Sequence, residues 1–80
     1  MYTRNKKDLD IAIKKIFAET FNIADVSDDD SIETISLWDS MGHMELISRI
    51  ENDFNVRIDP EDIIKLVSVT SIKEFLRGKE

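Results

Sequence analysis

The sequence predicts an all-α fold: one small domain of four helices, with a long loop after the first helix and a short third helix. The chain has 80 residues, which suits a single domain with a modest core. Apolar residues recur at spacings of three and four along several segments, which is the pattern of amphipathic helices. Short polar residues that favour helix starts stand in front of these segments.

The first helix is expected over residues 5–20. Its apolar positions form one stripe that should enter the core, namely Leu9, Ala12, Ile13, Ile16 and Phe17. Residues 21–39 are expected to form a loop, whose large side chains fold back onto the bundle at Phe21, Ile23 and Val26. Loops of this length are usually functional or disordered, and the apolar residues between positions 32 and 38 favour an ordered one.

The second helix is expected over residues 40–54. Ile47, Ile50 and Phe54 should face the core, with Leu46 at its edge. Asp39 and Ser40 are both strong helix-start residues, and either of them can be the cap. Gly42 costs up to ~1 kcal/mol in a first helical turn. It either leaves room for an approaching molecule or is simply tolerated.

The third helix is expected over residues 60–66, because Asp59 and Pro60 form a good helix start and acids follow in the first turn. The fourth is expected over residues 70–77, with Thr70 or Ser71 as its cap and Gly78 at its end. Apolar residues of this last helix should be buried against the bundle, namely Ile72, Phe75 and Leu76.

The acidic residues gather in the middle of the chain. The net charge is −6, but residues 25–62 hold twelve acids and two bases, a net of −10, and each flank is net positive. Such a field repels nucleic acid and steers basic protein surfaces toward the middle of the sequence. A merely solubilising acidic face is the other interpretation, and the position of Ser40 within it favours partner docking.

The second half of the chain resembles acyl carrier proteins, which are small four-helix proteins with a phosphopantetheine arm. The matching residues follow one another without gaps: Asp39-Ser40-Met41, Glu45-Leu46, residues 50–54, Val56, Ile58, the acidic turn 59–62 and Val69-Thr70-Ser71-Ile72. The resemblance is looser in the first half. It implies the four-helix bundle of that family, over a single domain of residues 1–80.

The resemblance implies that Ser40 receives 4′-phosphopantetheine from coenzyme A through a separate phosphopantetheinyl transferase, with Asp39 in a supporting role. The thiol of the arm would then carry acyl or aminoacyl groups as thioesters, which a chain without cysteine cannot otherwise do. A phosphate near a helix N-terminus is favoured by free N–H groups and by the helix dipole. The chain would be a carrier and a substrate of enzymes, and no catalytic residue of its own is expected.

The resemblance also assigns partner docking to the exposed face of the second helix, at Met41, Met44, Glu45 and Glu51. Methionine suits surfaces that meet several partners, although both methionines can equally fill the core. The expected partners are the transferase and acyl-loading and acyl-transferring enzymes with basic docking surfaces. Trp38 either packs beneath the site or stays partly exposed for a partner, and packing is favoured.

The sequence does not identify the acyl or aminoacyl group that the arm would carry. Gly42 and His43 stand where well-known fatty-acid carriers have an acid and a small polar residue, and Arg49 and Asn52 dilute the acidity of the second helix. These departures favour a carrier for a dedicated biosynthetic pathway over bulk fatty-acid synthesis. Fatty acyl, polyketide, D-alanyl and amino-acid carriers share this bundle, so a D-alanyl or amino-acid carrier is an alternative.

Parts of the sequence are compatible with two other functions. The chain can be an unmodified acidic helical module that binds a basic partner, in which case Ser40 is only a helix-start residue. Ser40 and His43 lie three residues apart and can form a serine–histidine pair of a small hydrolase, but no third residue orients His43. A carrier protein is preferred over both.

Several classes of protein are disfavoured by composition. There is no cysteine and only one histidine, and Ile32 and Glu33 break the only candidate calcium loop, so we expect no metal site. No apolar run approaches the ~20 residues of a membrane span, and the N-terminus lacks a secretory signal. We therefore expect a cytoplasmic monomer that neither binds nucleic acid nor inserts into a membrane.

Overall fold

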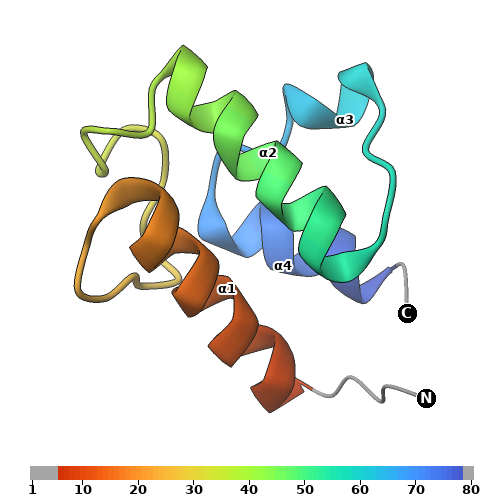
Figure 1. The fold of residues 1–80 in the computed structure, drawn as a ribbon, viewed down its shortest axis with the longest axis horizontal. Coiled ribbons are helices and arrows are strands. Elements are labelled where there is room, and N and C mark those ends of the chain that lie inside the picture. Colours follow the sequence, from red (N-terminus) through yellow and green to blue (C-terminus); the bar gives the residue numbers. More distant parts are fainter. Residues whose placement is uncertain (1–5, 79–80) are drawn as a thin grey trace.

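A computed structural model describes residues 6–78 of the protein (Figure 1). Within this range the chain forms helices and no strand, so the all-α prediction is confirmed. The helices are α1 (Lys6–Phe21), α2 (Ser40–Phe54), α3 (Pro60–Ile63) and α4 (Val69–Arg77). The expected first residue of α1, Asn5, lies outside the described residues. No helix within residues 6–78 has the length and apolar character that crossing a membrane requires.

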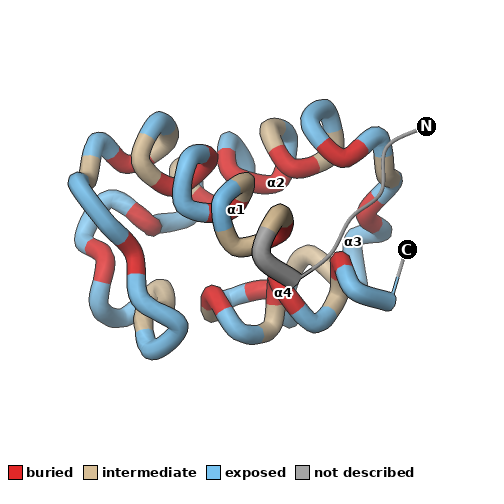
Figure 2. The backbone as a smooth tube through the Cα atoms, turned by 90° about the horizontal axis from the view of Figure 1, so that it is seen from below, coloured by how far each residue is buried: buried red, intermediate tan, exposed pale blue. Residues whose placement is uncertain are grey.

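One apolar core lies between α1, α2 and α4. Buried segments recur along these three helices, whereas α3 contains none (Figure 2). The stripe of α1 enters the core as expected, with Ala12 half-buried at its border. Leu46 was expected at the edge of the core, but its side chain is fully buried, because α2 packs against α1 on one side and has α4 beneath it.

Two helix ends differ from expectation. The N-cap of α4 is Ser68, whose side chain accepts a hydrogen bond from the Ser71 N–H at 3.1 Å, while the Ser71 hydroxyl lies 3.2 Å from the Ser68 N–H as its acceptor. Neither expected cap, Thr70 or Ser71, starts the helix. α3 ends at Ile63 and not at residue 66, because the next bonds, Lys65 N–H to Asp62 and Leu66 N–H to Ile63, tighten the chain into turns.

The long loop between α1 and α2 is ordered, because it is tied to the start of α4. The Val69 N–H donates to the Asp30 carbonyl at 3.1 Å, the Ile32 N–H donates to the Val67 carbonyl at 2.9 Å, and the Thr70 hydroxyl donates to the Asp28 carbonyl at 3.0 Å. Within the loop, hydrogen bonds from the Ser27 N–H and from Thr34 lower the pKa of the Asp30 carboxyl.

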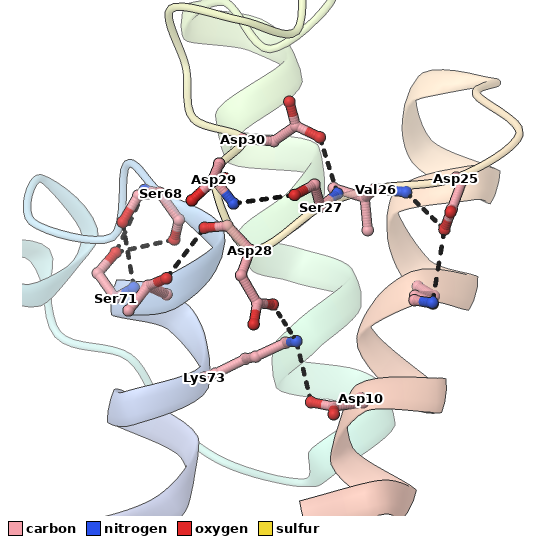
Figure 3. Close-up of polar contacts among 12 residues, drawn as sticks. Asp10, Asp25, Val26, Ser27, Asp28, Asp29, Asp30, Ser68, Ser71 and Lys73 are labelled. Carbon is pink, nitrogen blue, oxygen red and sulfur yellow. Dashed lines mark hydrogen bonds and ion pairs between the residues drawn. The ribbon is translucent and has the colours of Figure 1, made fainter.

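A buried lysine joins α4, α1 and this loop. The Lys73 ammonium lies 2.9 Å from Asp10 on α1 and 2.5 Å from Asp28 in the loop (Figure 3). Burial works against the charged form of Lys73, but the hydrogen bonds to Asp28 and Asp10 outweigh it, and the pKa of Lys73 is raised above its ordinary value. The lysine therefore stays charged in the folded protein and fixes the loop that leads to α2.

Candidate functional site

The start of α2 is capped by Asp39. This residue has extended backbone angles, and its carboxylate accepts a hydrogen bond from the Gly42 N–H at 2.8 Å. Its carbonyl accepts the first helical bond, from the His43 N–H at 2.7 Å. Asp39 is therefore the cap, and Ser40 is the first residue of the helix and has no capping duty.

The Ser40 side chain is exposed at the N-terminal end of α2. Within residues 6–78 no hydrogen bond engages its hydroxyl, in contrast to the hydroxyls of Ser68 and Ser71, which hold the start of α4. The first N–H groups of a helix have no partner inside it, and together with the dipole they favour a phosphate group. Ser40 thus offers a free hydroxyl at a place that suits a phosphate ester.

The backbone around Ser40 closes into a tight turn over residues 37–43, which we call the Ser40 turn. The Leu37 carbonyl oxygen lies so near Gly42 that a Cβ on residue 42 would stand 2.2 Å from it and 3.0 Å from the Phe21 ring. Of the two roles considered for Gly42, neither fits this contact: the glycine makes room for the chain's own backbone.

An aromatic cluster of Phe17, Phe21, Trp38 and His43 supports the Ser40 turn from below. Trp38 has 1% of its surface exposed and packs edge-on against Phe17, with ring centroids 5.1 Å apart. Its ring is stacked on Phe21 at 5.8 Å and on His43 at 6.1 Å. Trp38 therefore packs beneath the site, which confirms the favoured alternative.

His43 is buried, and both of its ring nitrogens are engaged. Nδ1 accepts a hydrogen bond from the Trp38 indole N–H at 2.9 Å, and Nε2 donates to the Ile63 carbonyl at 2.7 Å. An indole N–H can only donate and a carbonyl can only accept, so the ring is neutral with its proton on Nε2. His43 has no free nitrogen to take a proton from Ser40, and the serine–histidine pair of a hydrolase is absent.

The two methionines beside Ser40 are surface residues. Met41 is 84% exposed and Met44 is 51% exposed, so neither fills the core. Four further large apolar residues are exposed within the described residues, namely Ile11, Leu37, Ile64 and Val67. Sequence reasoning missed Leu37 in the Ser40 turn and Ile64 just after α3, which are 57% and 73% exposed.

The two glutamates assigned to docking are in different environments. Glu45 is exposed and lies 3.5 Å from Arg49, one helical turn along α2. Glu51 is half-buried, and its carboxylate accepts a hydrogen bond from the Ile58 N–H at 2.9 Å. Glu51 therefore fixes the segment between α2 and α3, whereas Glu45 lies at the surface in an exposed ion pair with Arg49.

Comparisons with known proteins agree with this geometry. The family model "Phosphopantetheine attachment site" matches residues 12–76, which include all four helices in part or in whole. An acyl carrier protein from Desulforapulum autotrophicum is 35% identical over 72 residues, covering 84% of this chain and 91% of that protein. The chain therefore belongs to the acyl carrier protein family, whose members carry a covalently attached phosphopantetheine group.

Proposed function

We propose that Ser40 is the residue to which phosphopantetheine is attached, and that this chain carries acyl intermediates for a dedicated biosynthetic pathway. The observation that supports this attachment site is that Asp39, and not Ser40, caps the start of α2. Asp39 caps the helix through its contact with Gly42, so the Ser40 hydroxyl is exposed and uncommitted. A serine that was only a helix-start residue would hold the first-turn N–H itself.

In the loading step the Ser40 hydroxyl is the acceptor. Its oxygen forms the phosphodiester while the bond between phosphopantetheine and the nucleotide part of coenzyme A breaks, and its proton goes to a base of the transferase. Since both ring nitrogens of His43 are engaged in hydrogen bonds, His43 is not available as that base. The bound group supplies a terminal thiol that holds the cargo as a thioester.

The exposed face of α2 supports docking with an apolar centre and an acidic rim. Met41 directly follows Ser40, Met44 lies one helical turn after it, both are exposed, and Glu45 follows on the same helix. A transferase and acyl-handling enzymes with basic edges around an apolar contact would fit this surface. Glu51 is a weaker candidate, because it is engaged with Ile58.

The residues that depart from the commoner carrier pattern support a role of this chain in a dedicated biosynthetic pathway. Gly42 and His43 have defined tasks in the Ser40 turn: one admits the Leu37 carbonyl and the other joins Trp38 to Ile63. Arg49 also pairs with Glu19 and Glu45, which reduces the acidity of α2. A D-alanyl or amino-acid cargo is the alternative within the same class.

The test is an intact mass measurement after incubation with a phosphopantetheinyl transferase and coenzyme A. The wild-type chain is expected to gain the mass of one phosphopantetheine, Ser40→Ala to gain nothing, and Ser48→Ala to load like wild type, because Ser48 is an exposed serine on the same helix. If the wild type stays unmodified by a transferase that loads another carrier, the proposal is wrong and an unmodified acidic binding module becomes the better interpretation.

A further inference from the structure

A side-chain hydrogen bond from His43 joins the helix α3 to the Ser40 turn. α3 has four residues and none of them is buried. The carbonyl of its last residue, Ile63, accepts the 2.7 Å hydrogen bond from His43 Nε2. Figure 1 shows α3 beside the N-terminal half of α2, in agreement with this bond. His43 therefore anchors the C-terminal end of α3 near Ser40, in addition to the packing of Ile63 against the core.

The same histidine extends this connection to the other side of Ser40. The Trp38 indole donates to Nδ1, and Trp38 precedes Ser40 by two residues, whereas His43 follows it by three. The chain of two hydrogen bonds runs in one direction, from the indole N–H through the imidazole to the Ile63 carbonyl. Bonds that share an imidazole polarise and strengthen each other in a buried site.

We propose that His43 is a positioning residue for the loading of Ser40. Its Nε2–H holds α3 in place, and with α3 the exposed Ile64, which directly follows the bound carbonyl. An enzyme that reaches the Ser40 hydroxyl must also cover the neighbouring exposed side chains, among them Met41 and Met44. Ile64 then belongs to the surface that the loading enzyme contacts.

This role predicts a particular kinetic effect. Releasing α3 changes the surface that the transferase recognises but leaves the Ser40 hydroxyl and its cap, Asp39, as they are. Loss of the tether should therefore raise KM for the carrier and leave kcat unchanged. The inference depends on the proposed function, because it assumes that Ser40 is the loaded residue.

Two substitutions at His43 separate its two hydrogen bonds. The amide of glutamine lies at the ε position, so His43→Gln keeps a donor for the Ile63 carbonyl. The amide of asparagine lies at the δ position, so His43→Asn keeps an acceptor for the Trp38 indole but does not reach Ile63. Each variant is first shown by urea unfolding to be folded at the assay temperature.

The experiment measures kcat and KM for loading by a phosphopantetheinyl transferase with coenzyme A. We expect KM to rise about 3- to 10-fold in His43→Asn, the effect of losing one net hydrogen bond, and to stay within about 2-fold in His43→Gln. In the wild type, ¹⁵N NMR of the His43 ring should show a protonated Nε2 and an unprotonated Nδ1.

The outcomes distinguish this inference from the proposed function. If the wild type is loaded and His43→Asn keeps the wild-type KM, or if both variants raise KM equally, His43 is no more than a core residue and the inference is overturned. A ring proton on Nδ1 would overturn it as well. If the wild type is not loaded at all, the proposed function itself fails.

Discussion

The carbonyl oxygen of Leu37 occupies the space in which a side chain of Gly42 would begin. A Cβ on residue 42 would lie 2.2 Å from this oxygen, which is far inside van der Waals contact. The oxygen belongs to the backbone of the Ser40 turn, so it cannot move aside without moving Trp38 and Asp39. The backbone conformation of the Ser40 turn therefore requires glycine at position 42.

Gly42→Ala should therefore destabilise the protein, although helix propensity alone predicts a gain of up to ~1 kcal/mol. Gly78→Ala is the matched control, because Gly78 also lies at a helix end and the nearest atom to a Cβ there is 3.4 Å away. Urea unfolding should show a lower midpoint for Gly42→Ala and an unchanged or higher one for Gly78→Ala. Equal midpoints would contradict the close approach of Leu37.

The second prediction concerns the cap. Asp39→Ala removes the acceptor of the Gly42 N–H and should lower the free energy of unfolding by about 1 kcal/mol. Asp39→Asn keeps an acceptor of the same reach and should cost less. Ser40→Ala should change stability by no more than about 0.5 kcal/mol, because the Ser40 hydroxyl holds nothing. A larger loss in Ser40→Ala than in Asp39→Ala would assign the cap to Ser40.

Much of this fold follows from spacing alone. The apolar stripe of α1 and the start of α2 could be predicted, because burial at every third or fourth residue and a short acid before a helix each have a local cause. The cap of α4 could not be placed as easily. Three polar residues close together, Ser68, Thr70 and Ser71, all suit a helix start. The choice among them depends on loop residues 28–32, which hydrogen-bond to residues 67–70.

The site was harder to predict where it depends on tertiary contacts. The position of Ser40 at the start of a helix follows from the local sequence, whereas the sequence left open whether Met41 and Met44 are exposed. The role of His43 does not, because its partner Ile63 is 20 residues away and offers only a backbone carbonyl, which every residue has. Gly42 was misread for the same reason, since its neighbour is the backbone of Leu37.

The third prediction is a loss of stability at high pH through Lys73. Hydrogen bonds to Asp28 and Asp10 raise the pKa of Lys73 above its ordinary value of 10.5 in spite of its burial. A group whose pKa is higher in the folded state contributes stability fully below its unfolded pKa, and the contribution disappears as the pH rises through the folded pKa. The contribution should therefore be constant up to about pH 9.5 and decline above 10.5.

Lys73→Met is the variant that isolates this effect. At neutral pH it should lower the free energy of unfolding by about 1 kcal/mol, a modest value because Asp28 is largely exposed and water can replace the lysine. The difference between wild type and Lys73→Met should shrink when both are unfolded in urea above pH 10.5. A difference that grows in that range would mean that Lys73 is held in its neutral form.

The last prediction distinguishes a glutamate of α2 that stabilises the fold, Glu51, from one that contributes to partner docking, Glu45. Glu51→Ala leaves the Ile58 N–H without its acceptor and should lower the free energy of unfolding by about 1 kcal/mol, whereas Glu51→Gln keeps an acceptor and should cost less. Glu45→Gln removes the charge of Glu45 and should change the free energy of unfolding much less, because the Glu45–Arg49 ion pair is exposed.

The kinetics of Ser40 loading then show which of the two carboxylates, Glu45 or Glu51, contributes to binding of the transferase. If the acidic rim attracts the transferase, Glu45→Gln should raise KM for the carrier, and added salt should reduce the difference from wild type. Glu51→Gln should have the smaller effect on KM, because that carboxylate already accepts a bond from the chain. The reverse order, with a folded Glu51→Gln variant and an unaffected Glu45→Gln variant, would move the centre of docking toward the C-terminal half of α2.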